Sequence, residues 1–240
     1  MSDLSESAET PEDEAISTPR TWPIGTTFWG NPLVGLDRRR TAATAVLLGC
    51  FALLFAVSYG GGVVTVDGQP IETTTAAFDS LSAFVIVFAV ALIVAGPIVY
   101  AVWNGGPVGA VAVAFVPIAL GEVATGRYAF GLDGAIATTT GVVGCVLGLY
   151  VIDVRETSSF RPWRVHLCSR EQLLLVTAIT VIGAVSVARF VASAPDFLAE
   201  IFAPFAMLWL VPLGLLGRYW LAHAHDSGSS QPTGTGSEPS

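Results

Sequence analysis

The chain has 240 residues, of which 52% are hydrophobic and only 12% are charged. This composition lies well outside the range of soluble globular domains and excludes that class. The net charge of −8 comes mainly from the ends, because residues 1–20 hold six acids against one Arg. All 11 basic residues are Arg, and together with the acidic tails this resembles the composition of halophilic proteins, whose hydrated carboxylates keep a surface soluble in salt.

The order of polar and apolar stretches divides the chain into four parts. We expect an acidic disordered tail at 1–20, an interfacial aromatic and basic lead-in at 21–40, a transmembrane domain at 41–222 and a disordered polar tail at 223–240. The first apolar run starts only after residue 40 and follows acidic sequence, so the N-terminus does not have the pattern of a signal peptide.

Six apolar stretches dominate the transmembrane domain, and each is about 20 residues long, the length that a helix needs to cross a bilayer. The fold class predicted is therefore an all-α polytopic membrane bundle of six transmembrane helices. The expected spans are Ala42 to Tyr59, Leu81 to Trp103, Pro107 to Ala124, Gly134 to Ile152, Leu173 to Val191 and Phe197 to Leu216.

The loop after the first span has two interpretations. Between Val63 and Thr73, β-branched residues flank Asp67-Gly68, which is typical of a short hairpin with a tight turn. A flexible polar loop next to the preceding glycine run is the alternative.

The arginines predict the orientation in the membrane, because positively charged loops stay on the cytoplasmic side. With both termini cytoplasmic, the inner side holds nine arginines and the outer side two. The inner set is Arg20, Arg38, Arg39, Arg40, Arg155, Arg161, Arg164, Arg170 and Arg218, and the outer set is Arg127 and Arg189. We expect a multi-pass protein of the cell membrane.

A basic loop follows the fourth span and interleaves arginines with aromatic residues. Its arginines are Arg155, Arg161, Arg164 and Arg170. One interpretation is a docking surface for anionic lipid headgroups or for a partner protein. The interpretation that we favour is an ordinary anchor at the cytoplasmic edge, because topology alone requires basic clusters of this size.

Small residues recur at three- and four-residue steps in the fourth span and so share one helix face. This helix-packing face consists of Gly134, Ala137, Gly141, Gly144 and Gly148. Such a face lets two helix backbones approach closely in lipid. We predict a central position in the bundle, with a homo-oligomer seam as the alternative. The hydroxyls of Thr138, Thr139 and Thr140 are expected to bond back to carbonyls of their own helix.

Three ionisable residues lie inside the expected spans, near their outer ends: Glu122, Arg189 and Glu200. Charges at this depth are candidate functional groups. The structural interpretation, which we favour, is that Arg189 pairs with one of the two acids and holds spans three, five and six together. The functional interpretation is an outer gate.

The sequence contains no catalytic, metal-binding or nucleotide-binding motif, so it predicts no cofactor, no metal and no nucleic-acid partner. The preferred hypothesis is a non-catalytic accessory or assembly subunit that contacts the lipid bilayer and a membrane partner or a second copy. A small-solute permease or channel is the alternative, supported by helix-interrupting prolines at Pro97, Pro117, Pro204 and Pro212. A membrane enzyme ranks third.

Overall fold

The computed structural model describes residues 31–70, 76–126, 128–164 and 168–229, and these are almost entirely helical. The acidic tail at 1–20, the aromatic part of the lead-in and residues 230–240 lie outside the described residues. In chain order the elements are α1 (Arg38–Val63), β1 (Thr65–Val66), β2 (Gln69–Pro70), α3 (Ala76–Val94), α4 (Gly96–Asn104), α5 (Pro107–Thr125), α6 (Leu132–Thr157), η2 (Pro162–Arg164), α7 (Arg170–Ser193), α8 (Asp196–Ala206), η3 (Met207–Trp209) and α9 (Leu210–Ser229).

Within the described residues, five helical segments are long and apolar enough to cross a membrane, or six if the bent pair α3–α4 counts as one. The two helices of that pair meet at 55°. Pro97 lies in the first turn of α4, where its missing N–H suits the start of a new helix better than the continuation of α3. The last segment is also interrupted, by the 3-10 turn η3 between α8 and α9, whereas α5 continues through Pro117.

The loop after α1 contains the hairpin that the Asp-Gly pair predicted. Thr65 pairs with Pro70 and Val66 with Gln69 in an antiparallel register. Asp67 and Gly68 have φ of 53° and 79°, the positive values that a two-residue type I′ turn requires.

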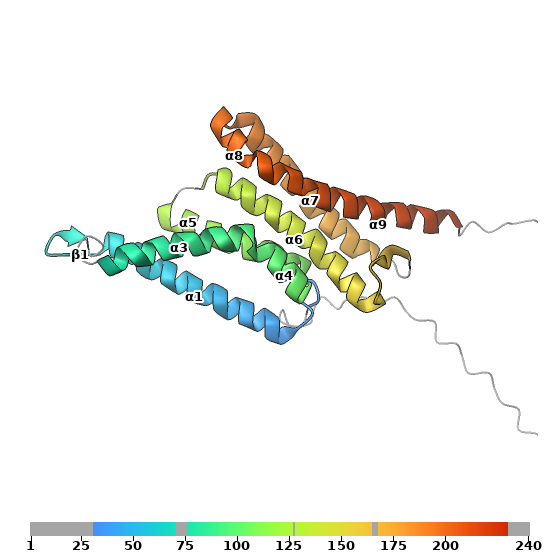
Figure 1. Cartoon of the computed structure of the whole chain (residues 1–240), viewed down its shortest axis with the longest axis horizontal. Coiled ribbons are helices and arrows are strands. Elements are labelled where there is room, and N and C mark those ends of the chain that lie inside the picture. Colours follow the sequence, from blue (N-terminus) through green and yellow to red (C-terminus); the bar gives the residue numbers. More distant parts are fainter. Residues whose placement is uncertain (1–30, 71–75, 127, 165–167, 230–240) are drawn as a thin grey trace, which may run out of the picture.

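Helix α6 occupies the centre of the bundle, with α1, α3, α4 and α5 on one side and α7, α8 and α9 on the other (Figure 1). In its most apolar stretch 78% of the residues are buried, against 11% in α1 and 11% in the α8–α9 segment. We call the end where α6 ends and α7 begins the basic end, and the end where α5 ends and α6 begins the far end.

From Gly141 to Gly148 the small-residue face of α6 packs against α4 and α5 of the same chain. A Cβ on Gly144 would lie 2.8 Å from the carbonyl oxygen of Pro97, and one on Gly148 would lie 2.9 Å from the backbone nitrogen of Pro107. The remaining members of the face are Gly134, Ala137 and Gly141, all buried. Only glycine allows the start of α4 and the start of α5 to come this close, so the face is occupied within one chain rather than open to a second copy.

Two helix ends differ from the sequence expectation. Helix α6 continues to Thr157 rather than stopping at Ile152, so Asp153 and Arg155 are helical and not part of a loop. Helix α9 continues to Ser229, so residues 223–229 extend a helix and are not a disordered tail. Hydropathy marks where a helix leaves the apolar layer, and a helix does not have to end there.

Candidate functional site

The three charges expected to meet at the far end remain apart. Glu122 accepts a hydrogen bond from the backbone N–H of Ala129 at 3.2 Å, and the side chains of Arg189 and Glu200 are exposed. Within the described residues, no ion pair joins any two of these three side chains. Helices α5 and α7 flank α6 from opposite sides (Figure 1), which separates Glu122 from Arg189. The predicted clip is therefore not formed in this structure.

Arg189 instead borders an open groove at the far end. The groove has a volume of about 310 Å³ and is lined by Phe130, Ser186, Arg189, Phe190 and Ser193. Both serine hydroxyls donate to carbonyls of their own helix, at 2.9 and 2.8 Å. Among the described residues that line this groove, Arg189 is the one that carries a charge.

Two neighbouring threonines of α6 form hydrogen bonds to the two interrupted segments, α3–α4 and α8–η3–α9. The Thr140 hydroxyl donates to the Ile93 carbonyl at 2.6 Å, closer than the Ile136 carbonyl of its own helix at 3.0 Å. Ile93 lies four residues before Pro97, so its carbonyl lacks the usual helical donor. The neighbouring Thr139 accepts a hydrogen bond from Trp209 Nε1 in η3 at 3.1 Å. Both breaks in the bundle are therefore fixed against the centre of α6.

A buried asparagine organises the basic end. Asn104 closes α4 and is fully buried. Its Oδ1 accepts from the backbone N–H of Asp37 at 3.0 Å, and its Nδ2 donates to the hydroxyls of Thr41 at 2.9 Å and Tyr100 at 3.0 Å. The Tyr100 hydroxyl in turn donates to the Val34 carbonyl at 2.6 Å. One amide thus ties the segment before α1 to the end of α4.

Glycines admit this segment into the bundle. A Cβ on Gly106 would lie 1.7 Å from the Val34 carbonyl oxygen, and a Cβ on Gly35 would lie 2.1 Å from Asn104 Nδ2. The backbone N–H of Val108 also donates to the Leu33 carbonyl at 2.9 Å. The described part of the expected lead-in is therefore packed between α4 and α5.

Two arginines bind the last carbonyls of α4. Arg155 Nη2 donates to the carbonyls of Val102 at 3.0 Å and Trp103 at 3.2 Å. Arg40 Nη1 donates to the same Trp103 carbonyl, and its guanidinium lies 5.6 Å from the centre of the Trp103 ring. Cations at a helix C-terminus compensate the partial negative charge of its unpaired carbonyls.

The expected basic loop is split by the longer α6. Arg155 faces α4, whereas η2, which carries Arg164, packs between α6 and α9. Arg161, Arg164 and Arg170 are exposed. The four arginines therefore do not form one continuous surface.

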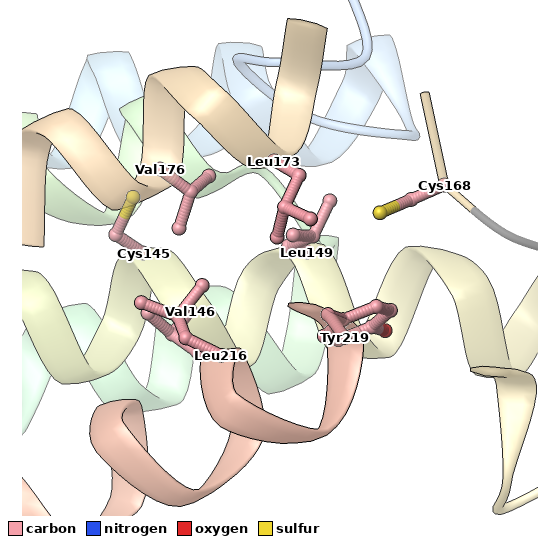
Figure 2. Close-up of a cluster of buried hydrophobic side chains, with 8 residues drawn as sticks. All are labelled: Cys145, Val146, Leu149, Cys168, Leu173, Val176, Leu216 and Tyr219. Carbon is pink, nitrogen blue, oxygen red and sulfur yellow. The ribbon is translucent and has the colours of Figure 1, made fainter. Parts of the chain in front are cut away.

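A second buried polar contact lies on the other side of α6. Asp153 is 3% exposed, and the fully buried Tyr219 donates its hydroxyl to Asp153 Oδ2 at 2.5 Å. Figure 2 shows Tyr219 of α9 beside Leu149 and Cys168, within the apolar cluster that joins α6, α7 and α9. The ring of Trp163 meets that of Tyr219 edge-on, with centroids 6.1 Å apart.

Cys168 lies just before α7 and is buried in the same cluster (Figure 2). Burial, and then the negative charge of Asp153, raise the pKa of the Cys168 thiol to about 12. A thiol with this pKa stays protonated at neutral pH and lacks the thiolate that nucleophilic or metal-binding cysteines need. Among the described residues, no group of three or more His, Cys, Asp or Glu side chains is arranged to hold a metal ion.

Sequence reasoning missed both buried polar groups of the basic end. Asp153 directly follows the expected span Gly134 to Ile152, and Asn104 directly follows the expected span Leu81 to Trp103. The available signal was the position itself, since a polar residue at the end of a span often has backbone groups of a neighbouring helix end to satisfy.

Comparison with known proteins adds no relative. No protein-family model, no curated protein and no solved structure matches this chain.

Proposed function

We propose that the chain crosses the cell membrane six times with both termini in the cytoplasm. The bent pair α3–α4 then counts as one span and the α8–η3–α9 segment as another. Arg40, Arg155 and Arg170 all lie in helix turns at the basic end, which supports a cytoplasmic position for that end. Reporter domains fused to each terminus test the topology, and an external reporter at either terminus would refute it.

Within that topology we infer that the protein is a non-catalytic accessory or assembly subunit of a membrane complex. The supporting observation is a contrast between glycines inside and outside the bundle. At Gly144 and Gly148 the backbone of a neighbouring segment already occupies the space that a Cβ would need. Cβ atoms on Gly214 and Gly217 of α9 would instead meet nothing within 4 Å. Exposed small residues let a further helix approach closely, and close packing is what drives helix association in lipid.

The packed centre is consistent with this role. Ala137, Thr139 and Thr140 are fully buried, and the two hydroxyls are engaged with carbonyls. In the described residues, every buried side-chain nitrogen or oxygen has a hydrogen-bond partner. A water-filled path along α6 would need polar groups that still face solvent.

The test is purification of the tagged full-length chain in mild detergent, followed by native mass spectrometry. We expect a membrane protein bound in fixed stoichiometry, which the Gly214→Leu/Gly217→Leu double variant releases. Gly121→Leu on α5 is the matched control, because that glycine is equally open. A lone monomer, or a companion that the double variant retains, would refute the subunit role.

A small-solute permease or channel is the second candidate, supported by the 55° break between α3 and α4 and the Arg189 groove. Broken helices and open grooves recur in transporters. Solute flux into proteoliposomes that falls on Arg189→Gln, with thermal stability unchanged, would favour this candidate over the subunit role.

A further inference from the structure

Two arginines that are far apart in the sequence share one carbonyl at the basic end. Arg40 lies in the first turn of α1 and Arg155 in the last turn of α6, yet both donate to the Trp103 carbonyl. They border an open groove of about 670 Å³ whose other lining residues are Ile98, Val99, Val102 and Trp103. The groove therefore has a cationic rim and an apolar wall.

The rim keeps free hydrogen-bond donors and an excess of positive charge. A guanidinium has five N–H donors, and Nη1 and Nε of Arg155 make no hydrogen bond to the described part of the chain. Among the described residues, the carboxylate in contact with the rim is Asp37, whose Oδ2 lies 3.5 Å from Arg40 Nε and whose side chain is 46% exposed. Two cations against one solvated carboxylate favour an anion with several acceptor oxygens.

An apolar slot continues from the groove into the bundle. It has a volume of about 270 Å³, lies between α1, α3 and α4, and shares Val99 and Trp103 with the groove. Leu47 lines it on α1, about 10 Å along the helix from Arg40 at 1.5 Å per residue. The slot lies beside the bend between α3 and α4, since Ala95 and Gly96 also line it.

We propose that the groove and slot form a site for one anionic glycerophospholipid, with its phosphate between Arg40 and Arg155 and an acyl chain in the slot. A phosphate accepts paired N–H donors from guanidinium groups, and basic pockets between helices at a cytoplasmic edge suit lipid headgroups. The half-exposed Trp103 indole lies at the boundary between the two parts, where its amphipathic ring suits the headgroup layer.

The apolar slot distinguishes this ligand from a soluble phosphate, which has nothing to place there. The rim distinguishes it from an apolar partner helix, which would leave the guanidinium groups without an anion. The inference rests on the proposed placement in a membrane but not on the subunit role, because lipid binding is measured without a partner.

The experiment measures lipid retention by the purified chain. We exchange the protein into nanodiscs that contain equal amounts of phosphatidylglycerol and phosphatidylcholine, extract it gently and count bound lipids by native mass spectrometry. We expect one phosphatidylglycerol per chain, and at least a tenfold loss of that species in Arg40→Gln/Arg155→Gln. Arg161→Gln/Arg164→Gln removes the same charge outside the groove and should retain the lipid.

A second variant tests the slot without changing charge. Val99 is 61% exposed and lines both cavities, so Val99→Trp should fold and reduce retention by blocking the acyl chain. An excess of glycerol phosphate should not displace the lipid, whereas displacement would indicate a site for soluble phosphate. Equal loss in both arginine double variants, equal retention of phosphatidylcholine, or a dimer that dissociates on Arg40→Gln/Arg155→Gln without bound lipid would each overturn the proposal.

Discussion

The basic end and the far end of the bundle use polar side chains in different ways. At the basic end Asn104 and Asp153 are buried and hydrogen-bonded to groups from other elements. At the far end Arg189 and Glu200 are exposed. Polar side chains thus connect elements inside the bundle at one end and lie on the surface at the other.

The packing of helix ends explains the difference. At the basic end the terminus of α4, the start of α5 and the segment before α1 are packed so closely that a Cβ on Gly106 would overlap the Val34 carbonyl oxygen. Buried backbone groups there need partners from nearby side chains. At the far end α5 ends on Gly126 with φ of 63° in an exposed turn, where solvent serves the same groups.

The largest expected effect concerns Cys168, which should react slowly if the basic end is as closed as the structure indicates. With a pKa of about 12, the thiol should label with maleimide at pH 8 about a thousandfold more slowly than an ordinary cysteine. The control is Ser193→Cys at the exposed far end, with each site read by peptide mass spectrometry.

The labelling rate of Cys168 should also depend on pH differently from that of the control. The Cys168 rate should keep rising tenfold per pH unit above pH 9, where the control levels off, because its thiolate forms only near its raised pKa. Equal rates at pH 8 would mean that the basic end opens readily.

The second prediction tests the close packing of α6 against the start of α4. Gly144→Leu places a side chain where the Pro97 carbonyl already lies 2.8 Å from a Cβ, and we expect a loss of about 3 kcal/mol or more in unfolding free energy, or failure to fold. Thermal unfolding in detergent measures it. Gly49→Leu, at a glycine with open space on α1, should behave as the wild type, and a normal melting profile for Gly144→Leu would contradict the packing.

The third prediction removes the amide that organises the basic end. Asn104→Ala leaves the Asp37 N–H without its acceptor and takes away the donor to Thr41, so we expect a loss of about 2 to 3 kcal/mol. Glu122→Ala removes a comparable acceptor at the far end and should cost much less. Equal losses in chemical unfolding would remove the contrast between the ends.

Two tyrosine hydroxyls offer a matched pair for the fourth prediction. Tyr219→Phe leaves buried Asp153 Oδ2 without this donor, which should cost about 1 to 2 kcal/mol. Tyr59 donates to the Ala124 carbonyl at 2.6 Å, but in an exposed position at the far end, so Tyr59→Phe should cost less than about 0.5 kcal/mol. Melting temperatures of the two variants measure this difference, and Tyr219→Phe should have the lower one.

Periodicity and local signals in the sequence predicted the apolar helical segments, the packing face on α6 and the hairpin at Asp67-Gly68. Each of these depends on residues that are close together in the chain. The partners of Asn104 and Asp153 could not be predicted in this way, because they are distant in the chain. Asn104 bonds to Asp37, 67 residues away, and Asp153 bonds to Tyr219, 66 residues away. Thr140 shows both cases. The sequence predicted the hydrogen bond from its hydroxyl to a carbonyl of α6, but not the shorter hydrogen bond to the Ile93 carbonyl of α3. That contact depends on how α3 and α6 pack.

The smallest expected effect is at Arg189, and it distinguishes the structure from the charge clip that the sequence favoured. If Arg189 held three spans together, Arg189→Ala would destabilise the protein strongly, because loss of one partner leaves a buried charge unpaired. In the structure its side chain is exposed, so we expect a change within about 0.5 kcal/mol. A double-mutant cycle of Arg189→Ala with Glu200→Ala should give no coupling, measured by unfolding in detergent. Coupling of about 1 kcal/mol or more would show that the two helices pair these charges, and would place a structural connection at the far end as well.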